Sequence, residues 1–201
     1  MARLGIFGGS FDPIHVGHLI MAEAARETLK LDLVLFVPAA IQPLKQDQPV
    51  TGAEHRAAMI ARAIAGNPNF SLSNIEIERP GPSYTVDTLK LLRDDYRAAA
   101  LWFILGADAL VSFSRWRDPA GILAEARLAV VRRPGVTLNL STLSESLPHI
   151  EDNIDWVDAP LIDISATDLR RRAAGGLSLR YRVPDPVREY IEANRLYMSE
   201  D

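Results

Sequence analysis

Short apolar runs that alternate with stretches of helical periodicity constrain the fold of this 201-residue chain more than any other feature. The runs are rich in strand-forming residues, and they are Arg3–Gly8, Leu33–Val37, Leu101–Leu105 and Leu128–Val131. The first stretch between them carries apolar residues at helical spacing, at Leu19, Ala22, Ala25 and Leu29. Near-continuous apolar strands are typical of parallel sheets that are covered on both faces. We therefore expect an α/β fold.

The rest of the chain extends the alternation. Helices are predicted at Gly17–Leu31, Glu54–Ala65, Thr85–Tyr96, Pro119–Ala126, Thr167–Ala174 and Pro186–Arg195. A strand is predicted at Phe70–Ile77 and another near Asp155–Val157, and the acidic stretch after Leu138 is predicted to be a surface loop. This order indicates an open, mainly parallel, doubly wound sheet of the Rossmann-like kind, with helices on both faces. Ligands of such sheets lie outside the carboxyl ends of the strands, so the candidate residues are those directly after Phe7, Val37, Leu105 and Val131.

The composition excludes several kinds of protein. There is no cysteine, so disulfides, thiolate metal sites and cysteine nucleophiles are excluded. The longest apolar run, Ala98–Ala107, is too short to span a bilayer, and Asp12 and His15 interrupt the apolar N-terminal stretch, unlike a signal peptide. A net charge of −4 is unlike that of a nucleic-acid binder. We expect a cytoplasmic protein with neither a membrane nor a nucleic acid as its partner.

A single domain, residues 1–201, is expected at this length, with a C-terminal helical part from about residue 164 packed on the edge of the sheet. Charge is uneven within it. Six acidic residues and no lysine or arginine lie between Ser141 and Asp163, whereas five arginines and no acid lie between Leu169 and Val183. A local arginine cluster in an acidic protein suits a small polyanion, although two solvated surfaces of opposite charge would give the same pattern.

The segment after the first strand has the composition of a phosphate-binding loop. Gly8 and Gly9 let backbone N–H groups approach an anion closely, and Ser10 adds a hydroxyl. The segment runs into the N-terminus of a predicted helix, whose free amides and positive dipole end favour phosphate. These features predict that the first strand end binds a phosphate group.

Two histidines of this segment, His15 and His18, are three residues apart and share one side of the first helical turn. A zinc pair would need further ligands, and His55 and His149 lie in unrelated contexts. The other alternative is that both histidines only stabilise the fold and bind no ligand. No Walker A, G-x-G-x-x-G or G-x-S-x-G sequence occurs, so the common nucleotide and hydrolase motifs are absent.

Gly8–His18 resembles the signature of the nucleotidyltransferase superfamily that carries an H-x-G-H motif. Ile164–Arg170 resembles the I-S-S-T-x-I-R signature of the same superfamily, with Ala166 in place of the second serine. A closer resemblance, to bacterial nicotinate mononucleotide adenylyltransferases, comes from Ser83–Leu89, Gly106–Asp108, Trp116, Arg132–Gly135 and the ending Tyr190–Tyr197. The chain departs from that family at Leu44, where many members have a histidine before the lysine.

The resemblance implies adenylyl transfer. The 5′-phosphate of nicotinate mononucleotide attacks the α-phosphorus of ATP, which gives deamido-NAD and pyrophosphate. Because both substrates are anions, the protein has to neutralise, align and bind them, and no catalytic base is required. Mg²⁺ is expected to enter with the ATP phosphates, and no metal ligands are predicted in the protein. A homo-oligomer is left open.

The resemblance also assigns the candidate residues. Those expected to act in catalysis are His15, His18, Lys45 and Arg170. Those expected to bind ATP are Gly8, Gly9, Ser10, Phe11, Gly106, Asp108, Ile164, Ser165, Thr167 and Arg170. Those expected to bind nicotinate mononucleotide are Ser10, Lys45, Tyr84, Thr85, Trp116, Arg117 and Arg133.

Physical type supports these roles. His18 would donate to an α-phosphate oxygen, and Arg170 would offer a planar fork to the β- and γ-phosphates. Trp116 would supply a flat face for the pyridine ring, and Asp108 would accept from a ribose diol. The structural alternatives are a helix cap for Thr167 and Asp108 and core packing for Trp116.

Two other functions remain compatible with the sequence. One is a sister nucleotidyltransferase that uses nicotinamide mononucleotide, phosphopantetheine or glycerol 3-phosphate. The other is a nucleotide sensor that keeps the fold without turnover, and the intact His15, His18 and Arg170 argue against it.

Overall fold

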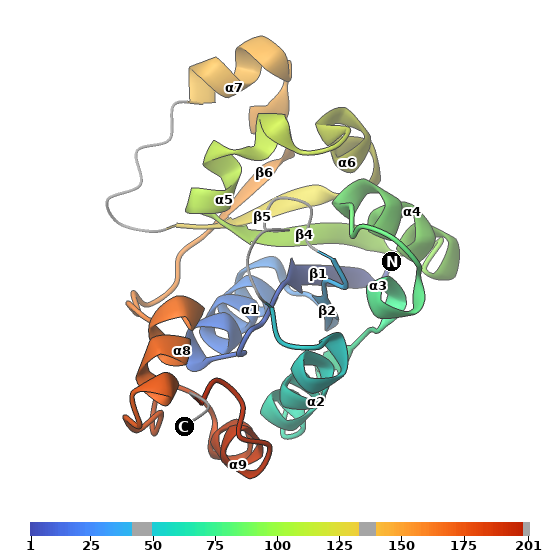
Figure 1. The fold of residues 1–201 in the computed structure, drawn as a ribbon. Coiled ribbons are helices and arrows are strands. Elements are labelled where there is room, and N and C mark those ends of the chain that lie inside the picture. The colour runs from blue at the N-terminus through green and yellow to red at the C-terminus, as the bar shows by residue number, and fades with distance from the viewer. Residues whose placement is uncertain (42–49, 133–139, 199–201) are drawn as a thin grey trace.

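The computed structural model describes residues 1–41, 50–132 and 140–198. Its centre is a six-stranded sheet with the order β3-β2-β1-β4-β5-β6, in which every neighbouring pair is parallel (Figure 1). The strands are β1 (Arg3–Gly9), β2 (Leu33–Pro38), β3 (Phe70–Leu72), β4 (Ala100–Gly106), β5 (Arg127–Val131) and β6 (Ile154–Val157). The predicted open, doubly wound sheet is confirmed.

The helices connect these strands. They are α1 (Val16–Leu29), α2 (Ala53–Ile64), α3 (Ile75–Glu78), α4 (Thr85–Asp95), α5 (Ala107–Val111), α6 (Pro119–Glu125), α7 (Leu140–Ser146), α8 (Ala166–Ala174) and α9 (Asp185–Ala193). Two short 3-10 helices are η2 (Phe113–Arg115) and η3 (Ile150–Asn153). Among the described residues, none of these helices is long and apolar enough to cross a membrane.

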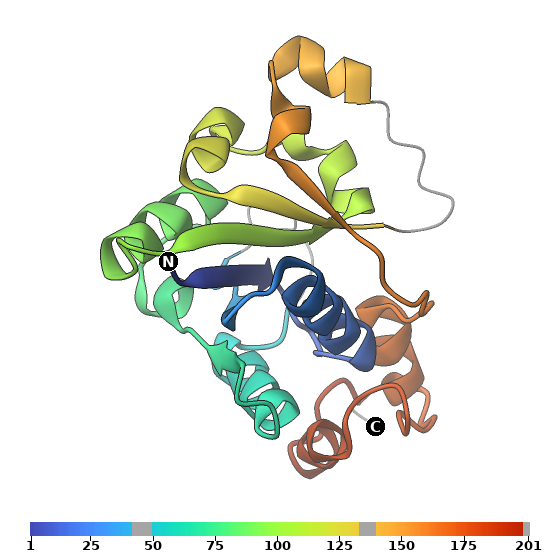
Figure 2. The ribbon, with the colours of Figure 1, turned by 180° about the vertical axis from the view of Figure 1, so that it is seen from behind.

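Two apolar layers cover the two faces of the sheet (Figures 1 and 2). On one face, Leu89 of α4 and Ile122 of α6 belong to one buried cluster with the strand residue Phe103. On the other face, Ile60 of α2 and Leu169 of α8 belong to a second cluster with Phe36, Ala22 and Ile191. The helices α8 and α9 thus extend the layer that α1 and α2 form.

The order of the strands fixes where a ligand can lie. From β1 the chain moves outward to β2 and β3, and from β4 it moves outward in the opposite direction to β5 and β6. The neighbours β1 and β4 are parallel, with Ile6 opposite Phe103. Their carboxyl ends, Gly9 and Gly106, therefore open at the same edge of the sheet, at the point where the connections diverge. Ligands of open parallel sheets bind in this crevice.

Two predictions of local structure are wrong. The strand predicted at Phe70–Ile77 ends at Leu72, and Ile75–Glu78 is the helix α3. Its Ile-Glu-Ile-Glu sequence has the alternation of a strand, but Glu76 is buried because its carboxylate accepts a hydrogen bond from the Thr88 hydroxyl, at 2.6 Å. The stretch after Leu138 was expected to be a loop, but it contains α7 and η3, which bury Leu143 and Ile150.

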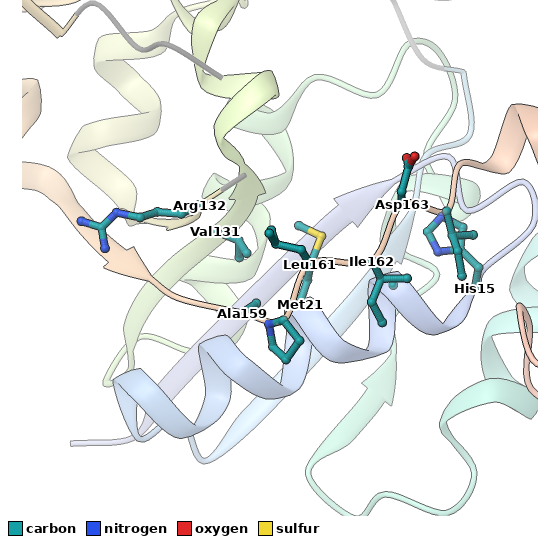
Figure 3. A pocket seen from close by; sticks show the side chains of 11 residues that line it. His15, Met21, Val131, Arg132, Ala159, Leu161, Ile162 and Asp163 are labelled. Carbon is teal, nitrogen blue, oxygen red and sulfur yellow. The ribbon is translucent and has the colours of Figure 1, made fainter. Parts of the chain in front are cut away.

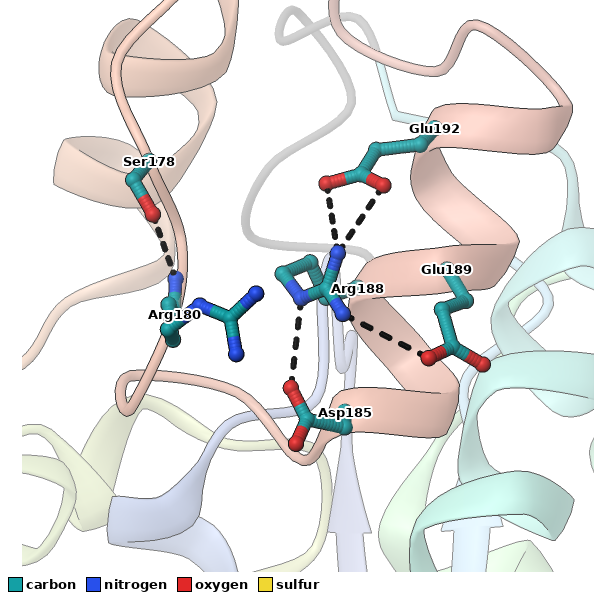
Figure 4. Close-up of polar contacts among 6 residues, drawn as sticks. All are labelled: Ser178, Arg180, Asp185, Arg188, Glu189 and Glu192. Atoms are coloured by element: carbon teal, nitrogen blue, oxygen red, sulfur yellow. Dashed lines mark hydrogen bonds and ion pairs between the residues drawn. The ribbon is translucent and has the colours of Figure 1, made fainter.

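The C-terminal helix α9 is held by its own charged residues and by α2. The Arg188 guanidinium donates to the carboxylates of Asp185, Glu189 and Glu192 along one face of α9 (Figure 4). Tyr190 of the same helix lies 2.9 Å from Nδ1 of His55 in α2, oxygen to nitrogen. The Arg188 bonds thus lie within α9, and the Tyr190 contact joins α9 to α2.

Candidate active site

The loop between β1 and α1 is shaped by buried aromatic packing. Phe11, which is 3% exposed, has a left-handed backbone with φ 50°. Its ring makes edge contacts with Phe7 and with His18, at centroid distances of 5.4 and 5.0 Å. The imidazole of His18 is therefore supported from the core side by aromatic rings, which limits the positions that it can adopt.

His15 and His18 form a stacked pair at the start of α1. His15 is the N-cap of the helix, and the two rings lie 3.7 Å apart at an angle of 23°. The backbone N–H of His15 donates to Nδ1 of His18, at 3.2 Å. Because Nδ1 accepts this bond, a neutral His18 carries its proton on Nε2. His18 thus keeps an N–H donor on the side away from its own backbone.

Gly17, between the two histidines, has a steric reason to be glycine. A Cβ at this position would lie 3.0 Å from Nδ1 of His15, which is closer than real Cβ contacts normally come. The missing side chain gives the ring of His15 room over the first turn of α1, and a Cβ there would push the ring by a few tenths of an ångström. The spacing of the motif therefore permits the stacked pair.

The C-terminal motif, Ile164–Arg170, contacts the loop between β1 and α1. The Ser165 hydroxyl caps α8 by accepting from the Asp168 N–H at 3.1 Å, so the cap is Ser165 and not Thr167. Arg170, one turn into α8, donates from Nη1 to the carbonyl of Asp12 at 2.7 Å. Two segments separated by 158 residues in sequence are thus joined three residues before His15.

A cavity of about 410 Å³ opens beside His15 (Figure 3). His15 lies at one end and Arg132, which follows β5, at the other, with its guanidinium turned away from the other side chains. Gly17 is also among the lining residues. The wall between them includes Met21 from α1 and the segment 159–164, with Ile164 from the C-terminal motif. The lining combines apolar side chains with the imidazole of His15 and the carboxylate of Asp163, whereas the Arg132 guanidinium pairs with Asp158. The apolar part of the wall suits a flat heterocycle.

The second candidate region lies on the opposite face of β4. Trp116 is half-buried, and its ring meets Phe103 edge-on at 5.9 Å. A Cβ on Gly8 would lie 3.3 Å from the ring of that same Phe103. Phe103 therefore lies between Trp116 and Gly8, near the carboxyl end of β1.

Tyr84 and Thr85 begin α4 close to Trp116. Tyr84 is the N-cap, and the guanidinium of Arg117 lies 4.4 Å over its ring. The helix N-terminus and the guanidinium are both suited to a carboxylate or a phosphate. Arg117 is also 3.9 Å from the Asp87 carboxylate, which holds it on this side of α4.

The remaining candidates have less definite surroundings. Gly106 is the N-cap of the short helix α5, so Asp108 is not the cap but a residue of its first turn, and it is exposed. Lys45 and Arg133 lie outside the described residues. Within the described ranges, no group of three His, Asp or Glu side chains could hold a metal ion.

Sequence reasoning missed Arg56, which supports the first loop from below. Its side chain is 1% exposed, and its guanidinium donates to the carbonyls of Ser10, Ala39 and Thr51 at 2.7, 2.7 and 2.8 Å. Burial lowers the pKa of Arg56. A signal was present, because Arg56 shares the i, i+3, i+4 stripe of α2 with Met59 and Ile60.

Sequence reasoning assigned no role to two further polar residues, Glu76 and Tyr197. Glu76 is buried, and burial raises the pKa of its carboxyl group. Tyr197 donates its hydroxyl to Oδ1 of Asp12 at 2.6 Å. Neither could be found from local sequence, because each depends on a partner in a distant segment.

Taken together, the loop, the paired imidazoles and the guanidinium at a sheet switch point define an α/β nucleotidyltransferase. The chain belongs to the cytidylyltransferase-like family, whose model matches residues 6–172. The resemblance drawn from its motifs is thereby confirmed.

Relatives and solved structures agree with this family. A protein of Thermomicrobium roseum named as a probable nicotinate-nucleotide adenylyltransferase is 48% identical over 199 residues, which covers 99% of this chain and 93% of the relative. A protein of Roseiflexus with the same name is 50% identical over 196 residues, 98% of each chain. The nicotinic acid mononucleotide adenylyltransferase of Plasmodium falciparum in complex with NaAD has the same fold, with a TM-score of 0.81, 19% identity and 98% of each chain covered.

Proposed function

We propose that this protein transfers the adenylyl group of MgATP to nicotinate mononucleotide and releases deamido-NAD and pyrophosphate. The observation that carries the proposal is the bond between Arg170 and the Asp12 carbonyl, which brings the guanidinium to the loop that leads into His15 and His18. Relatives of about half identity that are named for this activity support it.

The chemistry asks the protein for alignment and charge stabilisation. The attacking group is already a phosphate oxyanion, so no base has to activate it. The bond that forms joins this oxygen to the α-phosphorus, and the bond that breaks releases pyrophosphate. Holding the two nucleotides in line contributes up to about 7–11 kcal/mol through effective molarity.

His18 stabilises the charge that develops on the α-phosphate. Its Nε2–H donates while Nδ1 stays bound to the His15 backbone, so the donor is already oriented before substrate arrives. Arg170 has one nitrogen fixed on Asp12 and offers its remaining N–H groups to the departing phosphates. The Mg²⁺ of MgATP is part of that substrate.

The two regions beside the loop divide the substrates. The cavity between His15 and Arg132 takes the adenosine side of ATP, since its wall is largely apolar. The region of Trp116 and Thr85 takes the mononucleotide, with the ring on Trp116 and the carboxylate at the N-terminus of α4. Backbone N–H groups there would favour an acid over an amide, because an amide would present a donor to a donor.

Two further parts of the proposal concern the molecule as a whole. We infer that residues 1–201 act as one domain in the cytoplasm, and support for one domain is that Leu169 of α8 and Val187 of α9 share the apolar layer of α1 and α2. The roles of Lys45 and Arg133 in phosphate binding remain proposals from the sequence.

The test is pyrophosphate release from MgATP with nicotinate mononucleotide, nicotinamide mononucleotide, phosphopantetheine or glycerol 3-phosphate at equal concentration. We expect the highest kcat/KM with nicotinate mononucleotide and a product with the mass of deamido-NAD. Equal or better use of another acceptor would identify a sister enzyme. Nucleotide binding without turnover for every acceptor would identify a sensor.

A further inference from the structure

Asp12 is a meeting point of four segments of the chain. Its side chain is 3% exposed, and Oδ1 accepts from the Tyr197 hydroxyl at 2.6 Å while Oδ2 accepts from the Thr51 N–H at 3.2 Å. Its carbonyl accepts from Arg170 at 2.7 Å. The first loop, the segment before α2, the helix α8 and the residues after α9 therefore converge on one residue.

The carboxylate of Asp12 depends on these donors because it is almost fully buried. A buried carboxylate needs hydrogen bonds on both oxygens, and here the structure gives one from a backbone N–H and one from Tyr197. Burial and the negative charge of Asp12 raise the pKa of Tyr197, so its hydroxyl stays a neutral donor at any working pH. Donors of this kind to an ionised acceptor form the strong class of hydrogen bonds.

The backbone of Tyr197 also indicates that its position is held by its surroundings. Its φ is 65°, in the left-handed region that bulky side chains rarely adopt. Such conformations persist where neighbouring contacts determine them, and they concentrate at functional sites.

A displacement of Asp12 would reach the reacting groups directly. Asp12 lies three residues before His15, and its carbonyl holds the guanidinium of Arg170. If the carboxylate loses the Tyr197 hydroxyl, the loop turns toward another donor and both groups shift with it. Misplacement by about 1 Å can lower a rate by up to 100-fold without any loss of a reacting group.

We propose that Tyr197 is a positioning residue for adenylyl transfer, which acts through Asp12 on His15, His18 and Arg170. The inference rests on the proposed function, because the effect of Tyr197 is measured as a change in the rate of adenylyl transfer. Tyr197, which follows α9, would thus position the reacting groups without itself contacting either substrate.

The experiment compares Tyr197→Phe with Tyr190→Phe. Each variant removes one tyrosine hydroxyl from the C-terminal part of the chain, but only the first contacts Asp12, whereas Tyr190 contacts His55. We expect Tyr197→Phe to lower kcat by about 10- to 100-fold, with the KM for nicotinate mononucleotide within threefold of wild type. Tyr190→Phe should keep kcat within about twofold. Thermal melting of both variants shows whether either effect follows stability instead.

If Tyr197→Phe keeps the wild-type kcat, or if both variants lose kcat in proportion to their melting temperatures, the inference is overturned. Should Tyr197→Phe not fold, Asp12→Asn tests the same carboxylate, because a single amide oxygen cannot accept from both the Tyr197 hydroxyl and the Thr51 N–H, and the charge that strengthens the bond is lost. Unchanged kcat in Asp12→Asn also overturns the inference. A wild-type protein that is inactive with nicotinate mononucleotide contradicts the proposed function instead, so the two failures are distinct.

Discussion

The buried Arg56 gives the sharpest test of how the first loop is held. Three of its N–H groups donate to the carbonyls of Ser10, Ala39 and Thr51, and the side chain is 1% exposed. Hydrogen bonds to a charged group contribute roughly 1.5 kcal/mol or more each, so the three amount to about 4–5 kcal/mol. Arg56→Met fills much of the volume but leaves all three carbonyls without this donor.

For a domain of this size, each 1 kcal/mol shifts the melting temperature by about 2–4 °C. Arg56→Met should therefore melt about 8–20 °C below the wild type in a scan followed by circular dichroism. Arg56→Lys keeps the charge but has its donors on one nitrogen, so it cannot reach all three carbonyls. Its melting temperature should lie between those of the wild type and Arg56→Met. If the melting temperature falls in the order wild type, Arg56→Lys, Arg56→Met, the contribution of the charge is separated from that of the three hydrogen bonds.

Arg62→Met is the matched control, because Arg62 lies on the same helix, is exposed and, within the described part of the chain, donates to the Ala58 carbonyl alone. Its guanidinium also lies 4.2 Å over the ring of Tyr190, a contact worth about 0.5–1 kcal/mol at an exposed site. This variant should melt within about 4 °C of the wild type. An Arg56→Met protein that melts as close to the wild type as the control would refute the assigned role of Arg56.

Three other predictions follow from the site and its surroundings. His18→Ala should lower kcat by about 100- to 1,000-fold in the pyrophosphate assay, as expected for loss of one preorganised donor, and a smaller loss than tenfold contradicts its role. Gly17→Ala should lower kcat while the melting temperature stays the same or rises, because alanine favours the helix by about 0.5–1 kcal/mol but its Cβ meets His15 at 3.0 Å; unchanged kcat would show that the stacking of the histidines does not matter. Burial raises the pKa of Glu76 above its ordinary 4.5, so its protonated form is favoured by folding, and its stabilising contribution is complete below pH 4.5 and lost as the pH rises through the folded-state value. The free energy of unfolding of the wild type relative to Glu76→Gln should therefore fall as the pH rises from 4 to 8 in urea titrations, and a difference that is constant with pH would contradict this sign.

The sheet could be predicted from sequence because its signals are local. Apolar runs such as Leu33–Val37 are bounded by a proline, and the periodicity of Gly17–Leu31 can be read within one window. The error at Ile75–Glu78 has the opposite origin. Its alternation has the period of a strand, whereas the buried Glu76 has its partners outside the segment, among them the Thr88 hydroxyl 12 residues away.

The candidate site was predicted in part for a similar reason. The two motifs around His15 and Arg170 carry their chemistry in their own residue types, so both could be recognised before their contact was known. Arg56 and Tyr197 touch no substrate in the proposed reaction. The periodicity of α2 marks Arg56 only as a buried residue, and its contact with Ser10 spans 46 residues. The contact of Tyr197 with Asp12 spans 185 residues and leaves almost no trace in a local pattern.

The contact between Asp12 and Tyr197 has a consequence for synthesis on the ribosome. The first loop leaves the exit tunnel early, and its last hydrogen-bond donor is added 185 residues later. At elongation speeds of about 5–20 residues per second, this delay is about 10–40 s. During that time the nascent chain can already form β1 and α1, but it lacks the tyrosine hydroxyl that completes the shell of Asp12. Under the proposed role of Tyr197, the site around Asp12 is therefore completed only once residue 197 has been added.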